Sequence, residues 1–421
     1  MRVAHLLRKY NPTEWGGTET AIQQLFDGLR QHRVDAVVYC PRLGPNGHAV
    51  DPLAEAGCTV KRFRACLPVW GLSPERKRQM IAVGGNLMSF HLIGSLWREP
   101  GISVVHSHAL GRLGGIGLTV ARRRRIPFVV TIHGGVYDLP EEMRRSFNAP
   151  KPGGWEWGKL FGGLLRSRRI LTDADAIITC NPTEAAMIRV RHPDRRVVVQ
   201  PHGVQAQVYR CDHRPAAREA FPWLAGRSVL LAVGRIDPIK NQGWLVDRMP
   251  ELLQRHPRVL LVLAGACTDE EYGQALQRKI AQLGVGQNVI LAGRLPPADP
   301  RLIGLMQEAK AVILPSLSET FGLILLEAWA AGTAVLASHT SGATALIEPG
   351  ENGGLFELAK PETFYEAVEQ ILANPDWRAR SIDAGRRRVI AEYDTVVLTG
   401  RIRQLYEQLI EEKHAVRDPA R

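Results

Sequence analysis

The chain has 421 residues and a formal net charge of +12, and its length favours two domains of roughly 200 residues over a single domain. With 45% apolar and 23% charged residues and no uninterrupted run of about 18 apolar residues, the composition is that of a soluble globular protein and predicts no membrane span. The six cysteines lack a CxxC pair and the N-terminal apolar stretch is too short for a signal peptide, which favours a cytoplasmic protein over a disulfide scaffold or a zinc protein.

The positive charge is concentrated in the first half of the chain. Residues 1–205 contain 29 Lys and Arg against 16 Asp and Glu, a net charge of +13, whereas residues 206–421 contain 25 against 26. This asymmetry indicates that one half faces an acidic partner, either a membrane surface, a phosphorylated acceptor or nucleic acid. A basic surface that only keeps the protein soluble is the alternative. No nucleic-acid-binding motif accompanies the charge, so no nucleic-acid partner is expected.

The N-terminal segment has the outline of a phosphate-binding turn. A short apolar strand at residues 3–7 is followed by a loop that contains Gly16 and Gly17, and an amphipathic helix is predicted to begin near Thr18. A strand, a Gly-Gly pair and a helix in this order are typical of such turns, although most Gly pairs only reverse the chain. Strands and helices then alternate, which predicts a parallel sheet. A long helix is expected at residues 74–97, packed on the core rather than lying on a membrane.

Three histidines lie at the ends of two predicted strands. The strand at residues 104–108 ends in His-Ser-His, and the glycines after it fit no GxGxxG register, which argues against an NAD site. His106 and His108 are expected on opposite faces of the strand, so they are not expected to bind one metal ion together. His133 follows the strand at residues 128–132, in the position where open α/β sheets bind ligands. We therefore predict a functional rather than a purely structural role for His133.

The second half continues the alternation of strands and helices. The strand at residues 229–233 leads into the loop GRIDPIKN, which contains Arg235 and Lys240. A guanidinium fork close to an ammonium group can bind a diphosphate. Further helices are expected to begin at Pro361, Pro375 and Thr395, and they complete two doubly wound α/β domains with a cleft between them.

The stretch SETFGLILLEAW carries two carboxylates eight residues apart. A strand at residues 311–315 precedes a loop with Glu319 and a helix at residues 322–331. Gly322 allows close approach of a ligand, and a helix N-terminus attracts phosphate. Glu327 has apolar neighbours and should be at least partly buried, where sugar hydroxyls would be suitable hydrogen-bond donors. The alternative to a ligand site is an ordinary helix in which one glutamate is a cap and the other lies on the surface.

Together these motifs resemble the family-4 retaining glycosyltransferases of GT-B architecture over essentially the whole chain. The matching segments, in the order of that family, are GGTE at 16–19, THG at 131–134, GRxxxxKN at 234–241, E-x7-E within 319–335 and GENGGLF at 350–356. The E-x7-E pattern combined with FGL and AxGTxV is highly specific, and the other motifs are individually weak. The resemblance implies an acceptor-binding Rossmann-like domain at residues 1–205, a nucleotide-sugar-binding Rossmann-like domain at 206–390, and a helix at 391–421 that returns toward the first domain.

The resemblance also assigns roles to the residues that match its motifs. Arg235 and Lys240 would neutralise the diphosphate of the donor, and Glu319 would bind hydroxyl groups of the donor sugar. His133 would lie beside the sugar and help to stabilise positive charge at the anomeric carbon. These four residues are the predicted catalytic set.

The remaining predicted site residues would bind the nucleotide part of the donor. Phe321, Gly322 and Leu323 would offer backbone groups to phosphate and sugar, and Glu327 would accept hydrogen bonds from the ribose. Gly16 and Gly17 would approach the β-phosphate from the other domain as the cleft closes.

The expected chemistry is a hexosyltransferase-like transfer without a metal ion. No DxD pair lies in a suitable loop, and two cations with helix N-termini can stabilise the leaving group. No carboxylate nucleophile is evident, so the resemblance implies front-face transfer with retention, from a UDP- or GDP-sugar and with no other cofactor. At position 345 many relatives carry Glu where this chain has Ala345, which leaves the identity of the sugar open.

The expected acceptor is a glycan or lipid-linked molecule of cell-surface polysaccharide or glycolipid biosynthesis, bound at the inner face of the cytoplasmic membrane. The basic first half motivates this prediction, with an anionic membrane surface as a further partner. A soluble synthase that uses a small phosphorylated acceptor, such as a sugar phosphate or inositol phosphate, and a catalytically inactive GT-B subunit are the alternatives.

Overall fold

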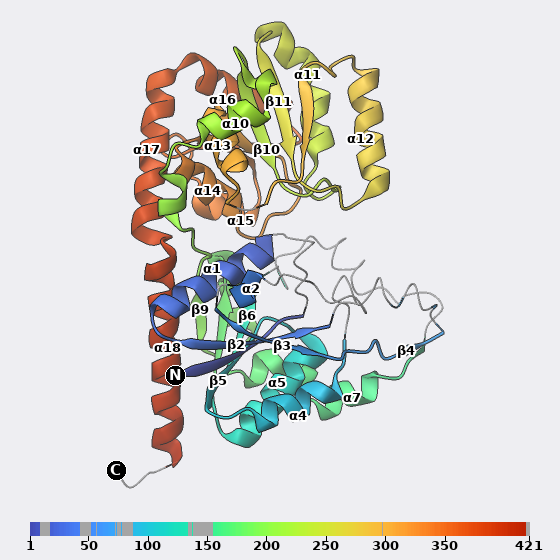
Figure 1. The fold of residues 1–421 in the computed structure, drawn as a ribbon, viewed down its shortest axis with the longest axis vertical. Coiled ribbons are helices and arrows are strands. Elements are labelled where there is room, and N and C mark those ends of the chain that lie inside the picture. Colours follow the sequence, from blue (N-terminus) through green and yellow to red (C-terminus); the bar gives the residue numbers. More distant parts are fainter. Residues whose placement is uncertain are drawn as a thin grey trace. The chain divides into compact units, whose positions relative to one another are not determined.

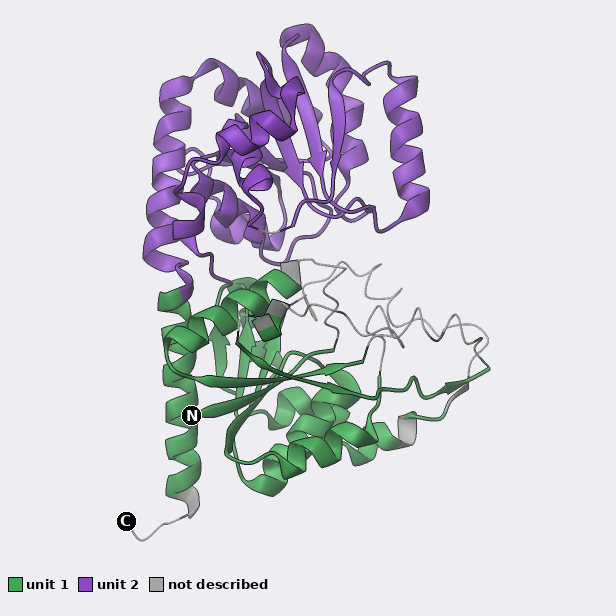
Figure 2. Cartoon of the chain, in the orientation of Figure 1, with its two compact units in different colours: residues 1–201, 396–421 green, residues 202–395 purple. Residues whose placement is uncertain are grey.

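The computed structural model describes residues 1–8, 17–42, 52–55, 57–71, 73, 77, 87–133, 137, 155–296 and 298–417 (Figure 1). These residues form two compact α/β units. Unit 1 contains residues 1–201 and 396–421, and unit 2 contains residues 202–395 (Figure 2). The sequence prediction had placed the first boundary at residue 205 and the start of the returning segment at 391. Among the described residues, no helix is both long enough and apolar enough to cross a membrane.

Unit 1 is built on a parallel sheet of seven strands in the order β3-β2-β1-β5-β6-β8-β9. The strands of this sheet are β1 (Arg2–Leu6), β2 (Asp35–Pro41), β3 (Thr59–Phe63), β5 (Ile102–Ser107), β6 (Phe128–Ile132), β8 (Ala176–Thr179) and β9 (Val197–Val199). The α-helices are α1 (Gly17–Gln31), α2 (Pro52–Glu55), α4 (Phe90–Arg98), α5 (Gly111–Arg124), α7 (Lys159–Leu164), α8 (Ile170–Asp173), α9 (Pro182–Arg191) and α18 (Thr395–Arg417). A short antiparallel pair joins β4 (Val69–Trp70) to β7 (Trp155–Glu156).

Helices cover both faces of this sheet. Neighbouring residues of a strand point to opposite faces, so each buried strand contributes to two apolar layers. In β1, Ala4 packs in the apolar layer that also contains Leu92 of α4, whereas Val3 packs in the layer on the other side. That second layer includes Phe26 of α1 and Tyr406 of α18. The last helix of the chain is therefore part of the core of unit 1.

Unit 2 contains a parallel sheet of six strands in the order β12-β11-β10-β13-β14-β15. Its strands are β10 (Ser228–Val233), β11 (Val259–Ala264), β12 (Val289–Gly293), β13 (Ala311–Leu314), β14 (Ala334–Ser338) and β15 (Gly354–Phe356). Its α-helices are α10 (Arg214–Ala220), α11 (Gln242–Arg255), α12 (Glu270–Gln282), α13 (Pro300–Glu308), α14 (Leu323–Ala331), α15 (Ser341–Leu346), α16 (Pro361–Ala373) and α17 (Pro375–Glu392). The strand order reverses between β10 and β13, and open sheets of this kind bind ligands outside the carboxyl ends of such a strand pair.

The long helix predicted at residues 74–97 was wrong at residues 87–89, which are not helical, whereas residues 90–97 belong to a helix as predicted. Met88 pairs with Cys66 in an isolated antiparallel bridge, and α4 begins only at Phe90. The side chain of Ser89 accepts a hydrogen bond from the backbone N–H of Leu92 at 3.1 Å. This N-cap starts a new helix at a point where the apolar pattern alone suggested a continuous one. Residues 74–76 and 78–86 lie outside the described part of the chain.

Candidate active site

The strand reversal in unit 2 brings Lys240 and Glu319 together. Lys240 lies in the loop after β10 and Glu319 in the loop after β13, and the two side chains form an ion pair. The backbone N–H of Leu317 donates a hydrogen bond to the carbonyl of Ile239 at 2.8 Å, so the loops are also joined through their main chains. Two residues that are distant in the sequence therefore meet at the carboxyl ends of adjacent strands, in the position that suits a ligand.

Asp237 shapes the loop that carries both predicted cations. One of its carboxylate oxygens lies 3.1 Å from the guanidinium of Arg235, and the other accepts a hydrogen bond from the backbone N–H of Lys240 at 2.9 Å. Asp237 is buried, whereas the side chain of Arg235 is half exposed. The sequence analysis did not single out this residue. The available signal was an Asp three positions before Lys240, since Asp side chains commonly accept hydrogen bonds from backbone N–H groups in turns.

Glu327 is buried in the middle of α14, as its apolar neighbours had suggested. Burial raises the pKa of this carboxyl group to about 7, and a hydrogen bond with Tyr209 opposes the rise. Burial, together with the nearby Glu327, holds the pKa of Tyr209 well above its usual range. Tyr209 belongs to a short 3-10 helix (Ala206–Tyr209), and the sequence analysis missed it because no motif connects it with α14.

The loop that carries Glu319 depends on two glycines, one at the start of α14 and one in α15. Gly322 caps α14 with φ of 89°, in the left-handed region that favours glycine. A Cβ atom on Gly342 would lie 2.5 Å from the backbone nitrogen of Phe321, and the N–H of Gly342 donates to the carbonyl of Glu319 at 2.8 Å. The SGATA segment, which ends at Ala345, therefore supports the loop that carries Glu319.

The predicted site residues of unit 1 are His133 and the two glycines Gly16 and Gly17. His133 directly follows β6, and its Nε2 atom lies 2.7 Å from Nδ1 of His108. Gly17 is the first residue of α1, and Gly16 lies outside the described part of the chain. Whether His133 and the two glycines contact a donor stays a prediction.

The expectation that His106 and His108 lie on opposite faces was wrong. Side chains two residues apart in a strand share a face, and the centroids of these two rings are 4.2 Å apart. Nδ1 of His106 lies 2.5 Å from the hydroxyl of Tyr406, and its Nε2 lies 2.6 Å from Oγ1 of Thr131. With His5 of the neighbouring strand, these side chains form a buried polar cluster on the face of the sheet covered by α1 and α18.

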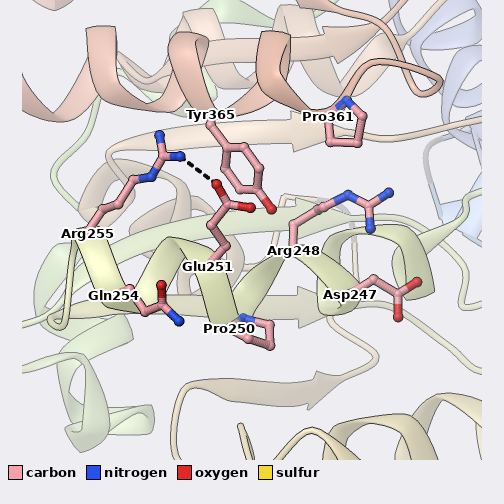
Figure 3. A pocket seen from close by; sticks show the side chains of 8 residues that line it. All are labelled: Asp247, Arg248, Pro250, Glu251, Gln254, Arg255, Pro361 and Tyr365. Atoms are coloured by element: carbon pink, nitrogen blue, oxygen red, sulfur yellow. Dashed lines mark hydrogen bonds and ion pairs between the residues drawn. The ribbon is translucent and has the colours of Figure 1, made fainter.

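A surface pocket of about 640 Å³ lies elsewhere on unit 2 (Figure 3). Residues of α11 and α16 line it, and an ion pair of 2.5 Å joins Arg255 to Glu251 at its edge. Burial, together with the nearby Glu251, raises the pKa of Tyr365 to about 12. The last turn of α11 leads into the start of β11, so this pocket is at the opposite edge of the sheet from Lys240 and Glu319. It contains none of the predicted site residues.

Two Rossmann-like units in one chain are the architecture of the GT-B glycosyltransferases. The profile described as "Glycosyl transferase 4-like domain" matches residues 16–203, and the profile "Glycosyl transferases group 1" matches residues 213–388. The chain belongs to the group 1 glycosyltransferases of family 4.

Curated relatives include enzymes named D-inositol 3-phosphate glycosyltransferase. The protein of that name from Frankia alni is 31% identical over 294 residues, which cover 67% of this chain and 69% of the relative. The one from Acidothermus cellulolyticus is 30% identical over 295 residues, which cover 68% of this chain and 63% of the relative. The match thus spans less than two thirds of the length of some of these relatives.

The fold is shared with HepE of Anabaena, whose crystal structure was solved in complex with UDP. The TM-score is 0.73 at 18% sequence identity, and the alignment covers 97% of this chain and 100% of HepE. The same protein was also crystallised with UDP-glucose. At this identity the comparison supports the fold, and the two Rossmann-like units of the present chain agree with it.

Proposed function

We propose that this chain transfers a sugar from a nucleoside diphosphate sugar that binds at the switch point of unit 2. The ion pair between Lys240 and Glu319 is the observation that carries the proposal. It holds a cation and a hydrogen-bond acceptor side by side at the carboxyl ends of β10 and β13. A bound diphosphate would attract Lys240 and Arg235, and the carboxylate of Glu319 would then be available to sugar hydroxyls. UDP is the favoured nucleotide because HepE binds UDP and UDP-glucose.

The nucleoside would be held by α14 and the turn before it. Glu327 is the proposed acceptor for the ribose hydroxyls, which could replace its hydrogen bond with Tyr209. Backbone groups of Phe321, Gly322 and Leu323 would contact the phosphates and the sugar. The family resemblance adds Gly16 and Gly17 as contacts of the β-phosphate.

The proposed reaction retains the anomeric configuration and needs no metal ion. The bond between the anomeric carbon and the phosphate oxygen breaks as the acceptor oxygen attacks the same face, and the leaving phosphate takes the acceptor proton. Charge on that phosphate would be stabilised by Arg235 and Lys240. His133 would stabilise positive charge on the sugar at the anomeric carbon.

The proposed acceptor is anionic and lipid-linked, and an exposed aromatic surface of unit 1 supports this part of the proposal. The aromatic surface consists of the exposed Trp70, Phe90 and Trp97 and the half-buried Trp157 and Phe161, and the exposed Leu164 follows on α7. Phe90 and Trp97 are seven residues apart on α4, and both side chains are more than half exposed. The ring centroids of Phe90 on α4 and Phe161 on α7 are 5.6 Å apart, so these two helices contact each other. Aromatic rings near exposed arginines such as Arg98 suit the surface of an anionic membrane.

A small phosphorylated acceptor is the second candidate, and the names of the relatives favour it. The proteins from Frankia alni and Acidothermus cellulolyticus are named for inositol 3-phosphate, an anionic polyol that the basic first half of this chain could also attract.

The first test is a thermal-shift panel of UDP-, GDP- and ADP-sugars, each with magnesium or with EDTA. A donor at 100 times its Kd should add about 2.7 kcal/mol to the free energy of unfolding. We expect stabilisation by a UDP-sugar, unchanged by EDTA and lost in Lys240→Met. Lys413→Met is the matched control, because Lys413 forms an ion pair of 2.6 Å with Asp175 in unit 1, whereas the proposed donor site is in unit 2. An equal response in both variants would contradict the proposed donor site.

The second test separates the candidate acceptors. With the identified donor, the product is analysed for transfer to inositol 3-phosphate and to a lipid-linked acceptor in vesicles, and the configuration at the anomeric carbon is determined by NMR. Binding to anionic vesicles but not to neutral ones, reduced in Trp97→Ser, would support the membrane surface. Inversion of configuration would refute the front-face mechanism, and an absence of any transfer would favour the inactive-subunit alternative.

A further inference from the structure

The two chain connections between the units are hydrogen-bonded to each other. Residues 201–204 lead from unit 1 into unit 2, and residues 393–396 lead back; these are the connecting segments. The backbone N–H of Val204 donates to the carbonyl of Tyr393 at 2.9 Å, and the N–H of Thr395 donates to the carbonyl of Val204 at 3.3 Å. A change of backbone conformation in one connecting segment is therefore transmitted to the other.

Each connecting segment places a ring against Phe321. The ring of His202 meets that of Phe321 nearly perpendicularly, with centroids 5.0 Å apart. The centroid of the Tyr393 ring lies 6.3 Å from that of Phe321. Both distances are typical of interacting aromatic pairs. Burial lowers the pKa of His202 to about 4, so its ring is neutral at pH 7 and packs as an uncharged group.

Phe321 lies in the loop between β13 and α14 that carries Glu319, here called the Glu319 loop. Helix α15 fixes the backbone of this loop, because the N–H of Gly342 donates to the carbonyl of Glu319 at 2.8 Å. A Cβ atom on Gly342 would lie 2.5 Å from the backbone nitrogen of Phe321. The Glu319 loop is thus held by α15 through its backbone and by the connecting segments through the side chain of Phe321. A shift of the Phe321 ring would move the backbone beside Glu319.

Arg388 of α17 joins the same elements by a second route. Its Nη1 donates to the carbonyl of Leu346, the last residue of α15, at 2.8 Å, and its guanidinium carbon lies 6.0 Å from the centroid of the Tyr393 ring. The first connecting segment also reaches α14, because Tyr209 in the 3-10 helix after it is hydrogen-bonded to Glu327. Both connections therefore contact the elements that carry the proposed donor contacts.

Core packing alone is the alternative explanation for these rings. Trp244 and Phe356 form such a pair in unit 2, and they come from α11 and β15. His202, Phe321 and Tyr393 differ, because none of them belongs to a helix or a strand. Their contacts therefore join the Glu319 loop to the two chain connections rather than a helix to a sheet.

We propose that His202 and Tyr393 are positioning residues for the donor site, which hold the Glu319 loop through the ring of Phe321. The conformation of the connecting segments and the order of this loop are then coupled. A donor that orders the loop stabilises one conformation of the segments, and that conformation favours the donor by the same factor. The inference rests on the proposed function, because it takes Glu319 and the backbone of Phe321 as donor contacts.

The test is hydrogen–deuterium exchange of the full chain without any ligand, followed by mass spectrometry of peptides that contain residues 317–325 and 340–346. Exchange in these peptides reports local opening of the Glu319 loop and of α15. His202→Ala removes the ring that contacts Phe321, whereas His202→Phe keeps a ring there. We expect exchange in both peptides to rise about two- to tenfold in His202→Ala, the factor that loss of one aromatic pair allows. In His202→Phe it should return to within about twofold of the wild type.

A second pair of variants and a control accompany this comparison. Tyr393→Leu and Tyr393→Phe repeat it on the other connecting segment, so the test stands if one variant fails to fold. Leu252→Val is the control for lost core packing, because Leu252 is buried in the last turn of α11, which leads to the edge of the sheet opposite the Glu319 loop. Exchange that is unchanged in both His202→Ala and Tyr393→Leu, or raised equally in Leu252→Val, would overturn the proposal.

Calorimetric titration with UDP gives a second readout. We expect the Kd for UDP to be about two- to tenfold weaker in His202→Ala than in the wild type and to be restored in His202→Phe. UDP should also slow exchange in wild-type peptides that contain Val204 and Thr395, because the coupling is reciprocal. Equal affinity for UDP in the wild type and His202→Ala would overturn the proposal. A wild type that does not bind UDP would count against the proposed function alone, and the exchange measured without ligand would still decide whether the connecting segments hold the loop.

Discussion

Replacing Glu327 with Gln is expected to stabilise the folded chain above pH 7 and to weaken donor binding. Glu327 is buried and its pKa is raised from 4.5 to about 7. Between these two values the folded chain holds a proton on Glu327 that the unfolded chain has released. The protonated form therefore contributes stability that is fully present below pH 4.5 and is lost as the pH rises through 7. Gln has the same shape, has no charge at any pH and can still accept a hydrogen bond from Tyr209.

The size of the effect follows from the shift in pKa. A difference of about 2.5 pH units corresponds to roughly 3 kcal/mol at pH 8.5, and this is an upper estimate because hydration of the site would reduce it. For a unit of about 200 residues, 3 kcal/mol raises the Tm by roughly 6–12 °C. At pH 5 the variant and the wild type should differ by less than about 1 kcal/mol.

The assay is calorimetric and urea-induced unfolding of wild type and Glu327→Gln at pH 5 and pH 8.5. At each pH, the free energy of unfolding of the wild type is subtracted from that of Glu327→Gln, and the two differences are compared. Contributions of other titrating groups cancel in this comparison. Glu366→Gln is the control, since Glu366 is an exposed carboxylate on α16. If Glu327→Gln shows no gain over wild type at pH 8.5, then Glu327 is not a buried carboxylate in the folded chain, and the argument for its role is refuted.

Three further predictions concern the surroundings of the donor site. Tyr209→Phe removes a hydrogen bond to the carboxylate of Glu327, so the pH at which donor affinity reaches half its maximum should rise by about one unit in calorimetric titrations; no change would place Tyr209 outside the site. Gly342→Ala puts a Cβ atom against backbone atoms of the Glu319 loop and should cost about 1–3 kcal/mol of stability together with donor affinity. Gly385→Ala brings a Cβ atom to 2.3 Å from the ring of the buried Trp329, so urea unfolding should show a similar loss of stability while donor affinity stays within twofold. Equal donor affinity in both glycine variants would contradict the proposed importance of the loop.

The fold of unit 2 was largely predictable because its elements have clear sequence signals. The strand at residues 259–264 is a continuous apolar run, and α11 begins at Gln242, directly after the GRIDPIKN loop. The proximity of Lys240 and Glu319 was also predictable. Parallel strands deliver their carboxyl ends to one edge of a sheet, so the loops after two neighbouring strands meet there.

The partners of the predicted residues were harder to find. Tyr209 lies more than a hundred residues from Glu327, and no local pattern connects them. His108 was visible in the sequence, but it was assigned to the wrong face of the strand. Side chains alternate with a period of two residues, so His106 and His108 share a face. Asp237 lies inside a recognised motif, yet its contacts with Arg235 and the Lys240 backbone depend on the folded turn. Motifs identified the residues that would touch a ligand more readily than those that hold them in place.

The return of the C-terminal helix has a consequence for how the protein is made. The chain leaves unit 1 after Pro201 and re-enters it at Val396, and the two connecting segments are hydrogen-bonded to each other at Val204 and Tyr393 (Figure 2). Ile402 and Tyr406 of α18 belong to the core of unit 1. During synthesis, unit 2 can complete its core while unit 1 still lacks the part of one apolar layer that α18 supplies. A truncation at residue 201 would leave the histidine cluster without Tyr406, so studies of an isolated first domain need residues 396–417 added back.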